Sequence, residues 1–233
     1  MRTFNLSDIE LTKYLFFTGK GGVGKTSIAC ATAVGLADNG KKILLISTAP
    51  ASNLQDVFNQ TLNGHGTDIQ EVPGLTVVNL DPEQAAAEYR ESVIAPFRGK
   101  LPDSVIQNME EQLSGSCTVE IAAFNQFSDF ITDADKAKEY DHIIFDTAPT
   151  GHTLRMLQLP SAWSTFISES THGASCLGQL SGLEERKGIY KQAVKTLSDA
   201  NATRLVLVSR PEIAPLKEAA RSSHELQLLG IKN

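Results

Sequence analysis

The stretch Gly19-Lys20-Gly21-Gly22-Val23-Gly24-Lys25-Thr26 decides the fold of this chain. It matches the pattern G-x-x-x-x-G-K-[ST] and lies between a short apolar run, Tyr14–Thr18, and a helical pattern from Thr26 to about Asn39. Glycines let the backbone curl so that successive N–H groups can cradle phosphate oxygens, helped by the positive end of the following helix. The pattern predicts a phosphate-binding loop; a glycine-rich turn that binds nothing is the alternative.

Three side chains of this loop carry the expected chemistry. Lys25 is placed to reach the β- and γ-phosphates of a nucleotide, and the Thr26 hydroxyl to ligate Mg²⁺. Lys20, directly after the first glycine, has no task in an ordinary phosphate loop. We therefore expect Lys20 to contact phosphate across an interface with a second ATPase half or a homodimer partner.

Length and composition restrict the class of protein. A chain of 233 residues with 41% hydrophobic content can bury one full α/β core. The formal charge of −6 argues against a broad surface for nucleic acid, so we expect no nucleic-acid partner. No apolar run has the length of a membrane span, Met1–Glu10 lacks the apolar core of a secretory signal, and three widely spaced cysteines indicate reduced thiols. These features predict a cytoplasmic protein.

Strand-like and helical patterns alternate along the chain. Alternation of this kind predicts an α/β fold with a doubly wound, mostly parallel sheet of the P-loop NTPase type, whose ligand lies at the carboxyl ends of the strands. Further strands are expected at Lys42–Ser47, Leu75–Leu80, Asp141–Asp146 and Arg204–Ser209, and later helices at Thr153–Leu159, Gly182–Leu197 and Pro215–Leu229, the last stopped by Gly230.

The region between the expected strands Leu75–Leu80 and Asp141–Asp146 has a helical pattern. Asp81-Pro82 is a helix start with proline in the first position, and the pattern then runs to about Asp133. We predict a single domain over residues 1–233 with a helical insertion over roughly 83–133, broken at Pro96, Gly99–Pro102 and Ser114–Ser116. Because Ile231-Lys232-Asn233 has the pattern of an approach to another strand, we expect a C-terminal truncation.

Asp146 ends an apolar strand, where a carboxylate without a partner is costly. Phosphate-loop enzymes use such a residue to hold Mg²⁺ or its water. The alternative is a helix N-cap at a strand end. Gly151, shortly afterwards, would let the backbone move when the γ-phosphate leaves.

Three segments together resemble the arsenite-transporting (arsenical pump-driving) ATPase family of deviant phosphate-loop ATPases. They are the loop with its extra Lys20, the segment Ser47-Thr48-Ala49-Pro50-Ala51-Ser52-Asn53, and the segment Asp146-Thr147-Ala148-Pro149-Thr150-Gly151-His152-Thr153-Leu154-Arg155. The cysteine-bearing segments Ser114–Thr118 and Gly173–Gly178 resemble the arsenite branch in particular. The resemblance spans essentially the whole chain and corresponds to the first of the family's two pseudo-equivalent halves.

The resemblance implies a Mg-ATP-binding catalytic subunit of an arsenite or antimonite efflux pump, with As(III) or Sb(III) stimulating ATP hydrolysis. It implies that Lys20 reaches the phosphates of the opposing half and that Asp146 lies in the second switch. A metalloid site shared with that half would contain Cys117, His152 and Cys176. The implied partners are a membrane arsenite efflux protein, which would hold the ATPase at the inner face of the membrane, and an arsenic metallochaperone.

The chemistry of the cysteines agrees with this implication. Trivalent arsenic and antimony are soft, so thiolates are the expected ligands. A free cysteine is also commonly a small buried hydrophobic residue, and we prefer that interpretation for Cys30 in the first helix. For Cys117 and Cys176, each expected in a Gly/Ser-rich loop, we prefer ligation. His152 would couple the metalloid to the nucleotide switch, unless it is a helix-start histidine bonded to backbone.

Ala49 departs from the family pattern, which has aspartate between Thr48 and Pro50. In relatives that carboxylate orients the attacking water or supports Mg²⁺, which alanine cannot do. Loss of such a group typically costs about 10²–10⁴ in rate. We predict that the chain binds Mg-ATP but hydrolyses it poorly, and we favour an engineered substitution over a natural loss.

Two other functions remain as alternatives. An ATP-dependent targeting chaperone for tail-anchored membrane proteins would use the same phosphate loop, but it needs a large, often Met-rich apolar groove, and the chain has only three methionines. A DNA-partition ATPase would need a basic surface that the acidic charge balance disfavours.

Overall fold

The computed structural model describes residues 5–48, 54–147, 183–228 and 231. In this part of the chain six strands form one sheet, in the order β3-β4-β2-β5-β1-β6. All neighbouring strands are parallel except β3 and β4, so the predicted α/β fold with a mostly parallel sheet is confirmed, and the antiparallel edge strand β3 was missed. The strands are β1 (Tyr14–Thr18), β2 (Ile43–Ser47), β3 (Thr67–Asp68), β4 (Leu75–Asn79), β5 (His142–Asp146) and β6 (Thr203–Leu207).

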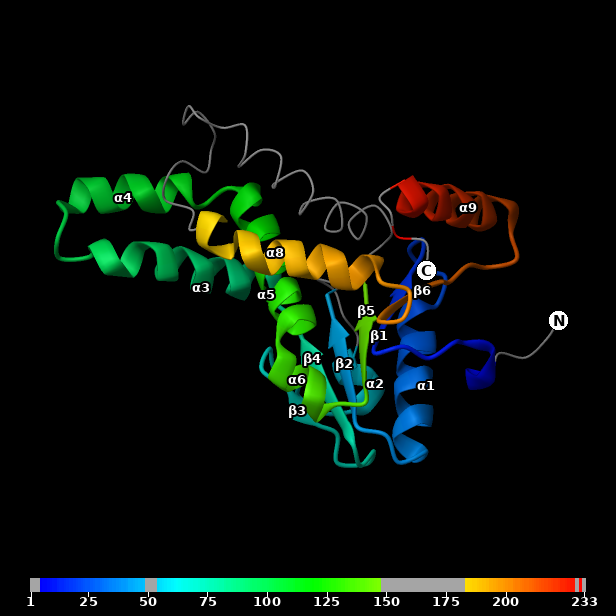
Figure 1. The fold of residues 1–233 in the computed structure, drawn as a ribbon. Coiled ribbons are helices and arrows are strands. Elements are labelled where there is room, and N and C mark those ends of the chain that lie inside the picture. The colour runs from blue at the N-terminus through cyan, green and yellow to red at the C-terminus, as the bar shows by residue number, and fades with distance from the viewer. Residues whose placement is uncertain (1–4, 49–53, 148–182, 229–230, 232–233) are drawn as a thin grey trace.

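Helices cover both faces of the sheet (Figure 1). Helix α1 packs on one face, and α5 and α8 pack on the other. The described helices are α1 (Lys25–Asp38), α2 (Leu54–Phe58), α3 (Pro82–Ile94), α4 (Asp103–Gln112), α5 (Ser116–Thr132), α6 (Ala134–Glu139), α8 (Leu183–Ser198) and α9 (Ile213–Leu228), with the short 3-10 helices η1 (Leu6–Asp8) and η2 (Ala95–Phe97).

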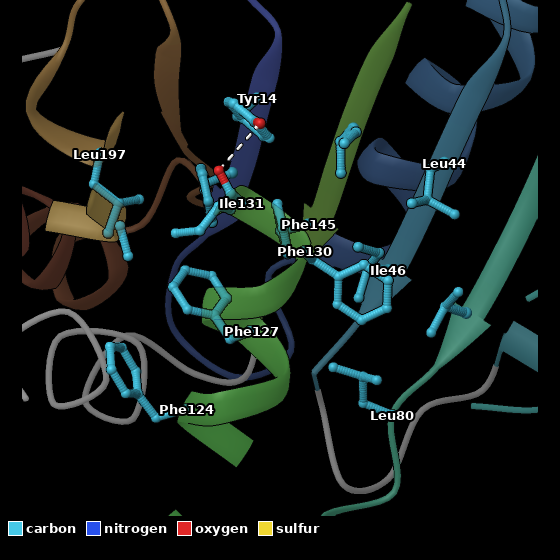
Figure 2. Packing of buried hydrophobic residues seen from close by; sticks show 14 of the residues in the cluster. Tyr14, Leu44, Ile46, Leu80, Phe124, Phe127, Phe130, Ile131, Phe145 and Leu197 are labelled. Atoms are coloured by element: carbon cyan, nitrogen blue, oxygen red, sulfur yellow. Dashed lines mark hydrogen bonds between the residues drawn. The ribbon is translucent and has the colours of Figure 1, made fainter. Parts of the chain in front are cut away.

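Strands β1 and β2 are buried along their whole length, as expected for a parallel sheet between helical layers, whereas β6 is mostly half-buried. On the α5 side, the stacked rings of Phe16 and Phe145 have centroids 4.4 Å apart, and Phe127 of α5 packs edge-on against both. Figure 2 shows this cluster, in which the Tyr14 hydroxyl donates to the carbonyl of Ile131 at 3.2 Å. The paired phenylalanines therefore fix α5 across the centre of the sheet.

Helices α3 to α6 occupy the chain between β4 and β5. Helix α3 begins as predicted, with Pro82 in the first turn and the Asp81 carboxylate accepting from the N–H groups of Glu83 and Gln84. Helices α3 and α4 enclose a small core of their own, made of Ile94, Ile106, Met109 and Leu113. The division of the chain into one domain with this insertion stays a prediction.

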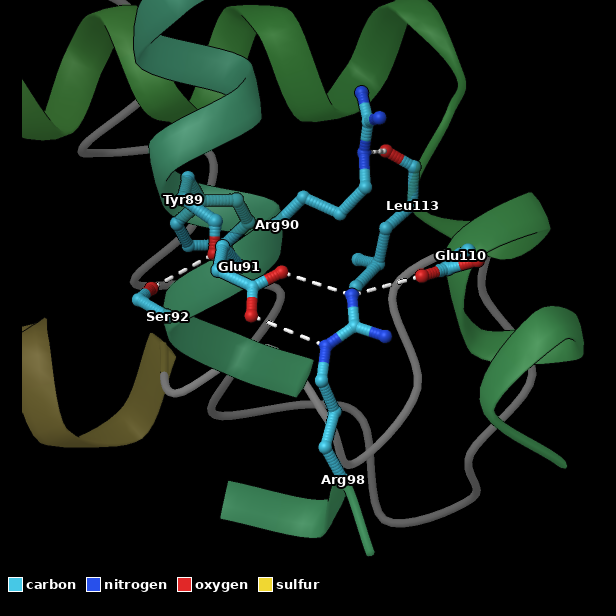
Figure 3. Close-up of polar contacts among 7 residues, drawn as sticks. All are labelled: Tyr89, Arg90, Glu91, Ser92, Arg98, Glu110 and Leu113. Atoms are coloured by element: carbon cyan, nitrogen blue, oxygen red, sulfur yellow. Dashed lines mark hydrogen bonds and ion pairs between the residues drawn. The ribbon is translucent and has the colours of Figure 1, made fainter. Parts of the chain in front are cut away.

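Outside that small core, charged side chains join α3 to α4. Arg98, just after η2, donates to both carboxylate oxygens of Glu91 and to Glu110, at 2.8 to 3.1 Å (Figure 3). The Nε of Arg90 donates to the carbonyl of Leu113 at 3.3 Å, where α4 ends. These contacts close the turn between the two helices.

Several boundaries differ from the sequence-based expectations. The helical region does not end at Asp133, as predicted, but continues in α6. Asp133 has extended backbone geometry and ends α5, and its carboxylate then caps the start of α6. Helix α9 begins two residues before Pro215, since a proline is tolerated in a first turn whose N–H groups have no helical partner. Helix α2 was not predicted. The expected helix Thr153–Leu159 lies outside the described residues, and so does Gly230, the predicted stop of the last helix.

Candidate functional site

The polar residues at the strand ends meet at the carboxyl edge of the sheet. Asp146 of β5 is in register with Phe17 of β1 on one side and with Ser47 of β2 on the other. Ser47 is in register with Asn79 at the end of β4. The phosphate-loop sequence begins directly after β1, so it lies at this same edge, where open α/β sheets bind their ligands.

The glycines of the loop adopt conformations that other residues resist. Gly22 and Gly24 have φ values of +76° and +94°. A Cβ on Gly19 would lie 2.2 Å from the carbonyl oxygen of Val208, so no larger residue fits at that point. Gly24 also caps α1 without a side-chain hydrogen bond. The first-turn N–H groups of a 14-residue helix are therefore left without a side-chain cap, the arrangement that favours an anion.

Lys25, the first residue of α1, is 8% exposed. Its Nζ donates to the carbonyl of Lys20 at 3.2 Å, across the loop. Burial lowers the pKa of Lys25, and the nearby Asp146 carboxylate partly opposes that shift. The side chain of Lys20 is exposed.

Thr26 and Asp146 form the polar contact between the loop and the sheet. The Thr26 hydroxyl donates to Oδ2 of Asp146 at 2.8 Å, while Oδ1 is buried and has no hydrogen-bond partner. Burial raises the pKa of Asp146, and the Thr26 hydrogen bond and the Lys25 charge lower it in part. A hydroxyl beside a buried carboxylate with a spare oxygen is a donor set that suits a hard divalent cation such as Mg²⁺.

Sequence reasoning missed further polar atoms at this edge. Buried oxygens without a partner also occur on Thr18, Thr48 and Asn79. Thr48 follows β2, and its N–H donates to the carbonyl of Asp146 at 3.0 Å. The signal was present in the sequence, because each of these polar residues ends or follows an apolar strand pattern.

Of the three predicted metalloid ligands, only Cys117 belongs to the described residues. Ala49, His152 and Cys176 lie outside the described residues. Cys117 is the second residue of helix α5, so its expected place in a Gly/Ser-rich loop is wrong: Gly115 caps the helix and the chain is already helical at Ser116. Over residues 5–48, 54–147 and 183–228 no cluster of three His, Cys, Asp or Glu side chains could hold a metal ion.

Cys30 is a packing residue, as predicted. It is 5% exposed and belongs to the cluster between α1 and the sheet. Burial, with a contribution from the negative Asp146, raises the pKa of its thiol to about 12. A thiol with such a pKa is almost wholly protonated at neutral pH and is a poor ligand for a soft ion.

A family model described as anion-transporting ATPase matches residues 12–233. The chain belongs to this family. It is 56% identical over 224 residues to an arsenical pump-driving ATPase of Escherichia coli, covering 96% of the chain and 38% of that relative. A putative arsenical pump-driving ATPase 2 of Aquifex aeolicus is 35% identical and matched over 77% of its length, and the ATPase GET3 of Komagataella phaffii is 31% identical and matched over 69%.

The chain spans little more than a third of the length of the Escherichia coli arsenical pump-driving ATPase. The family resemblance drawn from the phosphate loop and the switch segments is thereby confirmed. In the described part of the chain, no helix is both long and apolar enough to cross a membrane.

Proposed function

We propose that this chain is the first nucleotide-binding half of a metalloid-stimulated ATPase that binds Mg-ATP at the carboxyl edge of its sheet. The observation that carries the proposal is the hydrogen bond from Thr26 to the buried Asp146, at the end of a glycine loop that leaves a helix N-terminus uncapped. The loop N–H groups and Lys25 hold the β- and γ-phosphates. The 56% identity to an arsenical pump-driving ATPase supports the assignment.

Thr26 and Asp146 are the residues that hold Mg²⁺ in this proposal, and the spare Oδ1 of Asp146 fits that task. When bound, the cation supplies positive charge to the phosphate oxygens. Lys25 leaves the Lys20 carbonyl and neutralises charge that develops on the γ-phosphate as water attacks in line with the departing ADP. Lys20 adds a second positive charge at the phosphates of the opposing half.

Cys117, His152 and Cys176 are proposed to bind As(III) or Sb(III) together with the other half. Cys117 begins α5, the helix whose Phe127 packs against Phe145 next to Asp146. His152 follows Asp146 by six residues. Binding of the metalloid would therefore act on α5, which packs against β5, and on the segment that follows β5 in sequence. This is a physical route by which the metalloid would stimulate hydrolysis. The pump reading adds a membrane efflux protein, which would recruit a cytoplasmic ATPase to the membrane, and an arsenic metallochaperone as partners.

Ala49 keeps its predicted consequence within this proposal. Without a carboxylate at that position, turnover is slow although Mg-ATP binds. An ATP-dependent targeting chaperone for tail-anchored membrane proteins remains the competing function, and the 56% identity to an arsenical pump-driving ATPase favours the pump.

Binding measurements test the proposal without depending on turnover. Equilibrium dialysis with ATP and arsenite should show Mg²⁺-dependent ATP binding, and arsenite binding that is lost with Cys117→Ser or Cys176→Ser. Cys30→Ser is the matched control and should bind arsenite normally, because Cys30 is buried in the core. Arsenite binding that survives both substitutions would reject the metalloid site, and absence of ATP binding would reject the nucleotide site.

A further inference from the structure

Asn79 shares one row and one face of the sheet with Asp146. The register runs from Asp146 to Ser47 and from Ser47 to Asn79, so the three residues stand at one level on three adjacent strands. Two residues before each of them, in the order Asp146, Ser47 and Asn79, stands a side chain of the hydrophobic cluster between the sheet and α1: Ile144, Leu45 and Val77. Because side chains alternate along a strand, all three point to the α1 face, on which Thr26 meets Asp146.

The carboxamide oxygen of Asn79 is buried and has no hydrogen-bond partner. Two N–H groups of the surrounding backbone are paired: the N–H of Asn79 donates to the carbonyl of Asn63 at 3.1 Å, and the N–H of Leu80 donates to the carbonyl of Ser47 at 3.0 Å. Buried oxygens are nearly always paired, so an unpaired side-chain oxygen at this strand end calls for a partner that binds later.

The neighbouring acceptors narrow the identity of that partner. The unpaired oxygens of Thr48 and Asp146 lie at the same edge, and the Thr48 N–H is bonded to Asp146. Adjacent strands are about 4.8 Å apart, so Asn79 and Asp146 stand about 10 Å apart across Ser47. A separation of that size leaves room for a bridging water and excludes a direct contact between the two side chains.

We propose that Asn79 orients the water molecule that attacks the γ-phosphate, by accepting one of its hydrogens on Oδ1. This inference rests on the proposed ATPase function. A neutral amide accepts a hydrogen bond but does not take the proton, so Asn79 sets the direction of attack without serving as a base. Ala49 has no side-chain acceptor for this water. Asn79, at the end of the strand next to β2, has one.

Three substitutions separate this role from a structural one. Asn79→Leu removes the acceptor at nearly constant size, and Asn79→Asp keeps an oxygen there. Thr67→Val is the matched control, because Thr67 also has a buried unpaired oxygen but lies on the edge strand β3, opposite Val77 and outside the row of Asn79, Ser47 and Asp146. Removing a buried unpaired polar atom is neutral or stabilising when the replacement fits, so neither apolar variant should lower the unfolding midpoint.

The experiment measures single-turnover phosphate release, ATP affinity and the thermal unfolding midpoint on the full chain, in the Ala49 and the Ala49→Asp forms. Asn79→Leu should slow phosphate release about tenfold, with ATP affinity changed less than about twofold and the midpoint unchanged or raised. Asn79→Asp and Thr67→Val should keep the parent rate or exceed it. ATP affinity is measured by equilibrium dialysis and checked by isothermal titration calorimetry.

Two outcomes overturn the inference and leave the ATPase proposal intact. One is ATP binding with equal phosphate release in the parent and in Asn79→Leu. The other is a fall in rate that is matched by a lower midpoint and weaker ATP binding, the signature of a structural residue. If the parent chain binds no ATP in either assay, the proposed function itself fails, and the inference fails with it.

Discussion

The Thr26 hydroxyl donates a 2.8 Å hydrogen bond to Oδ2 of Asp146, a residue 120 positions later in the sequence. The contact joins the first turn of α1 to the end of β5, and it satisfies only one of the two oxygens of a fully buried carboxylate. This hydrogen bond therefore connects the end of the glycine loop to the edge of the sheet, and Oδ1 of Asp146 is left free to bind a further ligand.

Thr26→Ala should remove the Mg²⁺ dependence of ATP binding. The change takes away a hydroxyl and leaves Asp146 with both oxygens unpaired. A hydrogen bond to a charged group is worth about 1.5–3 kcal/mol, so the affinity for Mg-ATP should fall about 10- to 100-fold. Thr26→Ser keeps the hydroxyl and should bind nearly as the parent does. Titrations with ATP in Mg²⁺ and in EDTA check this, and equal loss in the serine variant would contradict it.

Cys30 should resist thiol reagents in the folded protein. Its thiol is buried, and its pKa is raised to about 12, so almost no thiolate exists at pH 8. Labelling with a chromogenic disulfide should give the same fast phase in Cys30→Ser as in the parent, and a further thiol should react only after unfolding. A fast phase that shrinks in Cys30→Ser would show that the residue is accessible.

The cap of α6 should make a pH-dependent contribution to stability. The Asp133 carboxylate accepts from the N–H groups of Asp135 and Lys136, and the hydrogen bond from the Lys136 N–H, with that from Asp135, holds the pKa of Asp133 below its usual value. Its stabilisation is therefore present above the unfolded-state pKa of about 3.9 and is lost as pH falls through the lower, folded-state pKa.

Asp133→Ala should accordingly lower the free energy of unfolding by about 1 kcal/mol at pH 7. The deficit should shrink as the pH falls below 4. Asp133→Asn keeps a capping oxygen without a charge, so its stability should follow the parent at pH 7 and lose this pH dependence. Urea unfolding at several pH values measures it; a deficit for Asp133→Ala that is constant with pH would refute the assignment.

The small core of the helical insertion should contribute more to the free energy of unfolding than its surface ion pairs do. Ile94 is completely buried between α3 and α4, so Ile94→Ala should cost about 2–5 kcal/mol. The Arg98 pairs with Glu91 and Glu110 are solvent-exposed, so Arg98→Ala should cost less, and the cost should fall with added salt. Urea unfolding of both variants at low and high salt compares them. An Arg98→Ala deficit as large as that of Ile94→Ala would reverse the ranking.

Where the sequence pattern was strong, the fold could be predicted from it. The five strands expected from apolar runs and the helix start at Asp81-Pro82 are present in the structure. Thr26 and Asp146 were both predicted to hold Mg²⁺, and the structure brings them into hydrogen-bond contact. The edge strand β3 could not be predicted, because two residues are too few to show an alternating hydrophobic pattern and the strand forms only by pairing with β4. Asn79 was overlooked because its unpaired oxygen is a property of the assembled edge.

Cys117 shows a different limit. Its Gly/Ser-rich surroundings predict a loop, yet Gly115 serves as the cap of a 17-residue helix whose packing against the sheet outweighs the local preference of two serines and a glycine. The roles of Cys117, His152 and Cys176 in metalloid binding therefore stay predictions.

Phosphate release by the Ala49→Asp variant, measured in the full chain with and without arsenite, tests the central claim most directly. We expect turnover above that of the Ala49 chain, raised several-fold by arsenite, with the stimulation lost in Cys117→Ser and Cys176→Ser but kept in Cys30→Ser. Brisk turnover that ignores arsenite would contradict the account and favour the targeting function.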